Sequence, residues 1–391
     1  MIARRLGTKL RSLARRFPVV TVTGPRQAGK TTLCRALFRR HRYVSLETPD
    51  TREYATQDPR GFLAELGSGA VIDEVQRAPA LLSYLQEEVD ARPRPGRFIL
   101  TGSANLGLLA GVSQTLAGRT GLLTLLPFGY DELRGFEHAP RERDAVLWSG
   151  GFPAVFDRKI PPSEWFPAYL ATYVERDVRQ ILNVTDLQAF HSFVRLCAGR
   201  VGQLVNLASL GADCGVTHNT ARAWLSVLEA SYVALRIPPW HANLGKRLIK
   251  TPKLYFVDSG LLCSLLGVRK PGQIAEHPLR GAIFENWVVT EILKSRTHRG
   301  LPADLHFFRS RAGLEVDVLV ETGPTLLTAE VKAGATVAAD FFASLNEFRR
   351  LLAASAGQRS VRARLVYGGD AAQRRSGVDV VPWRQVADTS W

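Results

Sequence analysis

Long hydrophobic runs are missing from this 391-residue sequence, and so is an apolar leader at its start. No stretch approaches the roughly 20 apolar residues that a membrane-spanning helix needs. The first residues are rich in arginine and lack the apolar core and the small-residue cleavage site of a secretory signal. We therefore expect a cytoplasmic protein with no membrane partner.

Cysteine is scarce, and its copies lie far apart in the sequence, at Cys34, Cys197, Cys214 and Cys263. No two of them have the short spacing of a zinc knuckle or of a redox CxxC motif. Such isolated cysteines suit a reducing compartment, where each is expected to be a small buried hydrophobic residue.

Acidic residues are absent from the first 46 positions, which hold 12 lysines and arginines. The rest of the chain has 39 basic and 36 acidic residues, so the net charge of +15 belongs mostly to this N-terminal segment. Overall charge is therefore a weak argument for a nucleic-acid partner. Residues 4–17 place apolar side chains on one helical face, which predicts a helix packed on the first domain with its basic side in water.

The clearest motif is Gly24–Thr31, in which two glycines separated by four residues precede a lysine and a threonine. The β-branched run 19–23 precedes it and residues 32–38 follow with helical spacing, so the order is strand, loop and helix. Glycines let backbone N–H groups converge on phosphates, and the helix N-terminus adds the positive end of its dipole. This pattern predicts an ATP site formed by Gly24, Pro25, Arg26, Gln27, Ala28, Gly29, Lys30, Thr31 and Thr32.

A second motif completes the chemistry that this loop requires. Lys30 would reach the β- and γ-phosphates, and the Thr31 hydroxyl would hold Mg²⁺. Residues 70–74 read as a strand that ends in Asp73 and Glu74, the Walker B pattern. Asp73 is expected to hold the hydration shell of Mg²⁺, and Glu74 to orient or activate the attacking water. The expected cofactors are therefore ATP and Mg²⁺.

Two further residues are candidates for catalytic roles. In a parallel sheet, the strand 97–103 would place Ser103 beside Glu74, where its hydroxyl could contact the γ-phosphate or the water. A strand-end hydroxyl with a local hydrogen bond explains Ser103 equally well. Arg119 precedes the apolar run 122–126 and is a candidate arginine finger or γ-phosphate sensor. A solvent-exposed arginine is the alternative, which spacing alone favours.

The segment from about 148 to 240 has helical spacing. We expect a helix over 186–204, a second from Asn206, a turn at 215–219 and a third helix from Thr220 that leads into the strand 232–237. This order predicts a winged helix-turn-helix module. A lid or protein-interaction module is favoured over DNA binding, because few basic residues occupy the face that would enter a major groove.

A second group of charged residues lies in the C-terminal third. Glu285 occurs early in a predicted helix, Asp317 in a predicted strand, and Glu330 and Lys332 together on the next strand. Glu-x-Lys places both charges on one face of a strand. The set resembles the PD-(D/E)xK restriction-endonuclease-like core, in which the carboxylates would share Mg²⁺ and Lys332 would polarise the phosphate. The alternative is a scaffold whose charges pair with one another.

Taken together, four motifs resemble the prokaryotic AAA-type ATPases that carry a C-terminal domain of unknown function. They are GPRQAGKTTL, AVIDEVQRAP, FILTGSAN and LAGRT, and the resemblance continues through residues 173–177 and 252–261. It implies that Lys30, Thr31, Asp73 and Glu74 are the nucleotide-site residues. It also matches Gly118–Arg119 to the family's GR pair, which favours the arginine finger. The resemblance implies no substrate.

The sequence thus predicts an α/β protein of three parts. An AAA-type P-loop ATPase core over 1–147 is followed by a winged-helix module over 148–250 and a restriction-endonuclease-like α/β domain over 251–391. We expect ATP hydrolysis that drives a switch or motor. Self-association through Arg119 and a nucleic-acid partner, DNA rather than RNA, are candidate interactions. The alternatives are an ATP-gated Mg²⁺-dependent nuclease and a nucleotide-regulated adaptor with an inactive nuclease-like scaffold.

Overall fold

The computed structural model describes residues 2–103, 112, 114–174, 186–240, 250–354 and 359–391. The chain divides into two compact units. Unit 1 comprises residues 1–128 with the short segments 230–232 and 297–301, and unit 2 comprises 129–229, 233–296 and 302–391. The three-part division predicted from the sequence stays a prediction. Within the described ranges, no helix combines the length and the apolar character needed to cross a membrane.

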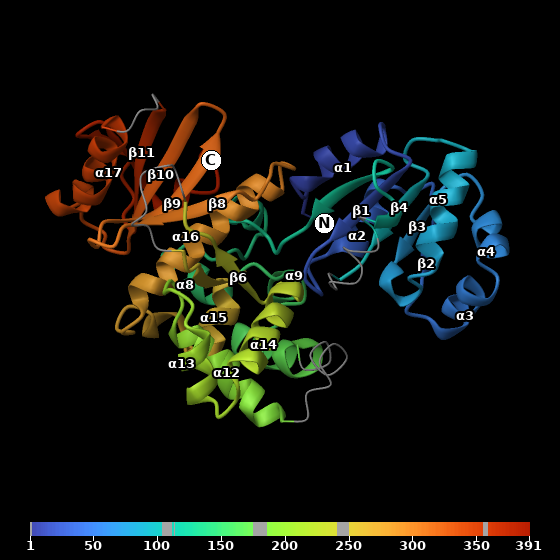
Figure 1. Cartoon of the computed structure of the whole chain (residues 1–391), viewed down its shortest axis with the longest axis horizontal. Helices are drawn as coiled ribbons and strands as arrows, with labels where there is room; N and C mark the ends of the chain where they lie inside the picture. Colours follow the sequence, from blue (N-terminus) through green and yellow to red (C-terminus); the bar gives the residue numbers. More distant parts are fainter. Residues whose placement is uncertain (1, 104–111, 113, 175–185, 241–249, 355–358) are drawn as a thin grey trace. The chain divides into compact units, whose positions relative to one another are not determined.

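Unit 1 is built on a five-stranded parallel sheet with the strand order β2-β3-β4-β1-β5. It is the blue to cyan part of Figure 1. Its helices and strands are α1 (Leu6–Ala14), β1 (Val19–Thr23), α2 (Lys30–Leu37), β2 (Arg42–Ser45), α3 (Pro49–Gln57), α4 (Pro59–Glu65), β3 (Ala70–Asp73), the 3₁₀ turn η1 (Val75–Arg77), α5 (Leu81–Ala91), β4 (Phe98–Thr101) and β5 (Thr120–Thr124).

The sheet of unit 1 is covered on both faces. Every residue of β1, β3 and β4 is buried, as expected for a parallel sheet between two helical layers. Val20 and Val71 belong to a core that α1 and α2 complete, whereas Val19 and Ile72 belong to a second core with α3, α4 and α5. Because the strands are parallel, their carboxyl ends lie at one edge of the sheet, where the predicted ATP-site residues follow β1 and end β3.

The first half of unit 2 is mainly helical. Its elements are α7 (Tyr130–Leu133), α8 (Arg143–Ser149), α9 (Pro153–Asp157), α10 (Pro162–Tyr169), the π-helical turn η2 (Leu170–Val174), α12 (Leu187–Gly199), α13 (Leu207–Asp213), α14 (His218–Ala230), β6 (Ala234–Ile237), β7 (Lys253–Phe256), α15 (Ser259–Leu265) and η3 (Pro271–Gln273). Residues 175–177 of the family motif and 104–105 of FILTGSAN lie outside the described residues.

The helix predicted over 186–204 is shorter than expected. Asp186 caps it, and it ends at Gly199. Gly202 then adopts φ +74°, and its N–H donates to the Leu254 carbonyl at 2.7 Å. A β-bridge joins Leu204 to Lys253. The chain therefore leaves the helix to lie along β7, a long-range pairing that helical spacing cannot reveal.

Strands β6 and β7 form an antiparallel pair directly after the three helices α12, α13 and α14. Thr217 caps α14, because its hydroxyl accepts the Thr220 N–H at 3.1 Å. The elements and their order are those that a winged-helix module requires, and the assignment itself stays a prediction. Residues 241–249, which separate the two strands in the sequence, lie outside the described residues.

The C-terminal part of unit 2 is a six-stranded sheet with the order β12-β13-β11-β10-β9-β8. The strands β8, β9 and β10 are antiparallel neighbours, whereas β10, β11 and β13 run parallel. The elements are α16 (Arg280–Thr297), β8 (Leu305–Arg309), β9 (Glu315–Thr322), β10 (Thr325–Lys332), η4 (Ala339–Phe342), α17 (Ala343–Ala353), β11 (Ser360–Tyr367), β12 (Gln373–Arg375), β13 (Val378–Pro382) and η5 (Trp383–Gln385). The likeness of this part to restriction endonucleases stays a prediction.

Candidate functional site

The glycine loop joins the end of β1 to the start of α2. Gly24 has φ +141°, and a Cβ there would lie 2.1 Å from the Leu125 carbonyl oxygen, so only glycine fits. Gly29 has φ +90° and is the N-cap of α2, which begins at Lys30. The loop therefore directs backbone N–H groups and the positive end of a helix toward one point, the arrangement that binds phosphate.

Lys30 lies at the centre of this loop and is only 5% exposed. Its Nζ donates to the carbonyl oxygens of Gly24 at 2.9 Å and Pro25 at 2.8 Å. Burial lowers the pKa of Lys30 to about 8, although the charges of Glu74 and Asp73 oppose the shift. The Lys30 ammonium therefore loses its proton at a lower pH than an exposed lysine does.

Asp73 ends β3 beside the loop. The Thr31 hydroxyl donates to the Asp73 carboxylate, with Oγ1 3.0 Å from each oxygen. The hydroxyls of Tyr43, at 3.0 Å, and of Thr101 also donate to it. Burial and the Asp73 charge raise the pKa of Tyr43 to about 12, so its hydroxyl keeps its proton. A hydroxyl and a carboxylate at this spacing are oxygen ligands suited to Mg²⁺.

The sequence analysis missed Tyr43 and Thr101. Thr101 ends β4, whereas Tyr43 is the second residue of β2, and these two strands flank β3 in the sheet. The signal was present for Thr101, because it precedes Gly102 at the end of an apolar strand. Tyr43 sits within β2, and only the sheet order brings it to Asp73.

Glu74 follows Asp73 and adopts a left-handed backbone conformation with φ +55°. A non-glycine residue rarely takes this conformation, and such strain concentrates at functional sites. Gln76 Nε2 donates to both the Glu74 carboxylate and Ser103 Oγ, the latter at 3.0 Å. Ser103 Oγ also lies 3.4 Å from Glu74 Oε2. The carboxylate is therefore held at the edge of the sheet by two polar side chains.

Arg119 immediately precedes β5, and its guanidinium pairs with Asp90 of α5. Nε lies 2.6 Å from Oδ1 and Nη2 lies 2.7 Å from Oδ2, a bidentate geometry. The Arg119 side chain is 33% exposed. Its role as an arginine finger stays a prediction.

The N-terminal arm contacts the loop through Arg4. Its guanidinium donates to the carbonyl oxygens of Ala28 at 2.9 Å and Leu126 at 2.6 Å, and it lies over the Phe128 ring. The expectation that the basic side of this arm lies in water is therefore wrong for Arg4. Its contacts are separated by more than 20 residues in the sequence, so helical spacing could not predict them.

The second predicted group, Glu285, Asp317, Glu330 and Lys332, also comes together, within unit 2. Lys332 Nζ lies 2.6 Å from Glu330 Oε1, and the Val331 N–H donates to Asp317 at 2.9 Å. Burial and the nearby charges of Glu285 and Glu330 raise the pKa of Asp317 well above its ordinary value. Burial likewise raises the pKa of Glu330. Burial is therefore the main reason why these carboxyl groups hold their protons more tightly than exposed ones.

Lys253 of β7, which the sequence analysis did not select, enters this group. Its Nζ lies 3.2 Å from Glu285, 2.5 Å from Glu315 and 3.8 Å from Asp317. Although burial opposes the charged form, these carboxylates raise the pKa of Lys253 above its ordinary value. Tyr255 of the same strand donates its hydroxyl to Glu285 at 2.6 Å.

The Mg²⁺ site predicted at this second centre stays a prediction, and the side chains around it include a lysine. Lys253 brings a positive charge among the carboxylates that would bind the metal. Among the described residues, no three or more His, Cys, Asp or Glu side chains are arranged to hold a metal ion. The candidate set is therefore assembled, but around an ammonium group.

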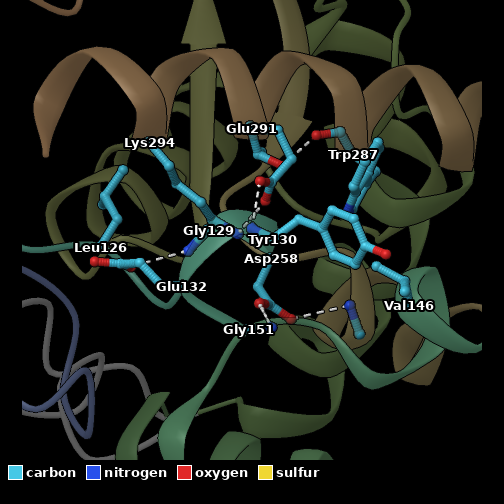
Figure 2. Close-up of polar contacts among 12 residues, drawn as sticks. Leu126, Gly129, Tyr130, Glu132, Val146, Gly151, Asp258, Trp287, Glu291 and Lys294 are labelled. Atoms are coloured by element: carbon cyan, nitrogen blue, oxygen red, sulfur yellow. Dashed lines mark hydrogen bonds and ion pairs between the residues drawn. The ribbon is translucent and has the colours of Figure 1, made fainter. Parts of the chain in front are cut away.

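A third buried polar network lies around α16 (Figure 2). Glu291 accepts the Tyr130 N–H at 2.7 Å and pairs with Lys294 at 3.0 Å. Asp258 is fully buried and accepts the N–H groups of Gly151, Gly260 and Leu261 at 2.7 to 3.1 Å. Burial nevertheless raises the pKa of Asp258. This network fixes the beginning of unit 2 to its central helix.

Comparison with known families agrees with the architecture of unit 1. Residues 16–134 match an "AAA domain". Residues 141–272 and 280–386 match two families described as "Domain of unknown function", DUF8612 and DUF4143. The parallel sheet, the loop and the AAA match together define an AAA-type nucleotide-binding ATPase domain.

Two curated relatives cover most of the chain. An uncharacterized protein of Mycobacterium tuberculosis and one of Mycobacterium bovis are each 33% identical to it over 342 residues, which is 86% of this chain and 75% of the relative. The chain belongs to the same family as these proteins.

Two solved structures resemble part of the chain. A Walker-type ATPase of Pyrococcus abyssi has a TM-score of 0.42 at 16% identity, covering 66% of this chain and 94% of its own. RuvB of Thermotoga maritima has a TM-score of 0.34 at 21% identity, covering 61% and 90%.

Proposed function

We propose that the chain binds ATP with Mg²⁺ at the glycine loop of unit 1 and hydrolyses it. The observation that carries this proposal is the pairing of Thr31 with Asp73 at the edge of the sheet, directly beside the buried Lys30. The Thr31 hydroxyl and the Asp73 carboxylate suit a metal ion, and the Lys30 ammonium beside them suits the triphosphate that this metal would bind. The AAA-domain match over 16–134 supports the same conclusion.

The proposed roles follow from the contacts. The backbone N–H groups of 24–32 hold the phosphates, and Lys30 turns from its loop carbonyls toward them. Thr31 and Asp73 hold Mg²⁺, which supplies charge neutralisation at the phosphates. Glu74 orients and activates the attacking water, while Ser103 and Gln76 fix the position of its carboxylate. Arg119 acts on the γ-phosphate of a neighbouring copy if the chain self-associates.

ATP hydrolysis is proposed to drive a conformational change in unit 2. Helices α12 to α14 and the β6–β7 pair are consistent with a winged helix, a fold that can contact DNA or a protein. A nucleotide-driven switch or motor, with nucleic acid as a candidate substrate, accounts for an ATPase domain and such a module in one chain.

The test compares Lys30→Ala and Glu74→Gln with the parent. Lys30→Ala is expected to abolish ATP binding, whereas Glu74→Gln is expected to retain binding and to lose turnover by about 100-fold or more. Binding is measured by calorimetry and turnover by phosphate release. Glu87→Gln is the matched control, because Glu87 is exposed and pairs with Arg60 at 2.8 Å. Parental turnover in Glu74→Gln would disprove the proposed role of this residue.

A second candidate function is a nucleotide-regulated adaptor that uses the C-terminal part as a scaffold. Lys253 favours it, because its ammonium compensates the carboxylates that a nuclease would use to bind metal. Retention of a defined protein partner only in the ATP state would support the adaptor. Mg²⁺-dependent cleavage that disappears in Asp317→Ala and Lys332→Ala would support the ATP-gated nuclease instead.

A further inference from the structure

Lys253 is a buried lysine inside a cluster of acidic side chains. It is 2% exposed, and its Nζ contacts Glu285 of α16 together with Glu315 and Asp317 of β9. Burying a lone ammonium would be costly, so its position depends on these carboxylates. The dependence is mutual, because the carboxylates also need a cation.

The remaining charges of the cluster are held separately. Arg309 Nη1 lies 3.3 Å from Glu315, and Lys332 lies 2.6 Å from Glu330. Glu330 is 6% exposed, and its second oxygen, Oε2, has no hydrogen-bond partner among the described residues. Lys253 is therefore the cation that Glu285 and Asp317, two of the predicted metal ligands, share.

The strand that carries Lys253 also connects two parts of unit 2. It pairs with β6, and residues that follow β6 bond to β8, with the Trp240 N–H donating to the Phe307 carbonyl at 2.6 Å. Lys253 thus extends from the β6–β7 pair to α16 and β9 of the C-terminal sheet. The ion pairs reinforce a junction that backbone hydrogen bonds already form.

We propose that Lys253 is the resident cation of this centre, so that the C-terminal part of the chain is a metal-free scaffold fastened to the β6–β7 pair. The ammonium fills the role that a divalent ion would take between Glu285 and Asp317. Removing it leaves Glu285, Glu315 and Asp317 without the cation that they share, and carboxylate oxygens are ligands that divalent cations such as Mn²⁺ bind. We therefore expect Lys253 to prevent metal binding at this centre, and its substitution to allow it.

The experiment measures Mn²⁺ binding to the full chain by electron paramagnetic resonance without nucleotide. All proteins carry Asp73→Asn, which removes the proposed metal-binding carboxylate at the end of β3, beside the glycine loop. The set comprises this background, Asp317→Asn, Lys253→Met, Lys253→Met with Asp317→Asn, and Lys253→Arg. Lys253→Arg is the matched control, because it retains a positive charge at the same position.

The expected result is no Asp317-dependent Mn²⁺ site in the background and one such site in Lys253→Met. The dissociation constant should fall roughly tenfold or more, because the repulsion from a nearby positive charge is removed. Asp317→Asn should abolish the new site, and Lys253→Arg should keep it closed. Mn²⁺ should also raise the melting temperature of Lys253→Met alone.

Two results would overturn the proposal. One is a background protein that binds Mn²⁺ and loses it on Asp317→Asn, since the centre would then hold a metal beside Lys253. This comparison needs no Lys253 variant, so it decides the matter even where Lys253→Met fails to fold. The other is a folded Lys253→Met protein that gains no site. Because nucleotide is absent, neither result depends on the proposed ATPase activity.

Discussion

At the scale of single residues, Lys30 combines burial with a charge that the proposed function requires. Burial lowers the pKa of its ammonium to about 8 in the free protein. A bound triphosphate would raise that pKa again, because an opposite charge nearby favours the protonated form. Binding of nucleotide is therefore coupled to the protonation of this one side chain.

This coupling predicts that ATP affinity falls as the pH rises above about 8, by about tenfold per pH unit at most. Calorimetric titrations between pH 7 and pH 10 would measure the slope. Lys30→Arg should give a flat profile, because the guanidinium stays charged throughout this range. A parental affinity that is constant from pH 7 to pH 10 would contradict the coupling.

The same pKa shift has a defined sign in the stability of the nucleotide-free protein. Folding lowers the pKa of Lys30 from its ordinary 10.5, so the unfolded chain binds more protons between about pH 8 and 10.5. The contribution of Lys30 to the free energy of unfolding should therefore rise with pH in that window. Denaturation of the parent and of Lys30→Met isolates this contribution as a pH-dependent difference between the two proteins.

At the scale of elements, α16 organises unit 2 through polar residues that are almost fully buried. Asn286 bonds both the N–H and the carbonyl of Phe256, at 2.7 and 3.0 Å. One turn further on, Glu291 and Lys294 pair with each other, and Glu291 also holds the N–H of Tyr130 (Figure 2). Because α16 is buried on most of its faces, its sequence has no polar stripe. The sequence pattern therefore predicted a helix here but not the contacts of its polar residues.

Removing one member of a buried ion pair should destabilise unit 2 strongly. Glu291→Ala takes away the carboxylate beside Lys294 and the acceptor of the Tyr130 N–H, so we expect a loss of about 3–5 kcal/mol. Glu291→Gln can retain an acceptor for Tyr130 and should cost less. Urea denaturation of the full chain measures both. Glu276→Ala, at an exposed position, is the control and should stay near the parent.

At the scale of the whole molecule, positive charge is concentrated in the first 46 residues, and the rest of the chain is nearly neutral. Part of that charge is committed to the fold, since Arg4 bonds the carbonyl of Ala28 in the glycine loop. The exposed face of α14 adds Arg222, close to its polar cap. A nucleic-acid partner would therefore contact a modest number of positively charged side chains.

If nucleic acid is the substrate of the proposed motor, DNA should stimulate the ATPase rate, and the stimulation should fade between low and moderate salt. Arg222→Ala should weaken the stimulation without changing the basal rate, whereas Arg269→Ala, another exposed arginine, should not. Phosphate release with single-stranded, duplex and branched DNA at two salt concentrations measures this. A rate that no nucleic acid changes at either salt concentration would favour the adaptor function.

The sequence by itself indicated those residues of the proposed ATP site that are close in the chain or at strand ends. Gly24, Lys30 and Thr31 lie within one loop, and Asp73 and Glu74 end one strand, so local spacing and the physics of phosphate binding were sufficient. The order of strands and helices in the C-terminal third was also predictable from periodicity, because each element has its own repeat.

Only the tertiary structure decided what surrounds those residues. Tyr43 and Thr101 meet Asp73 because their strands flank β3, and Lys253 reaches Glu285 and Asp317 across two elements. Contacts between residues far apart in the sequence depend on the order of the strands and on packing. No local pattern in the sequence reveals either of these. For the same physical reason, the C-terminal motif identified Glu285, Asp317 and Glu330 but missed Glu315 and the Lys253 ammonium that pairs with it.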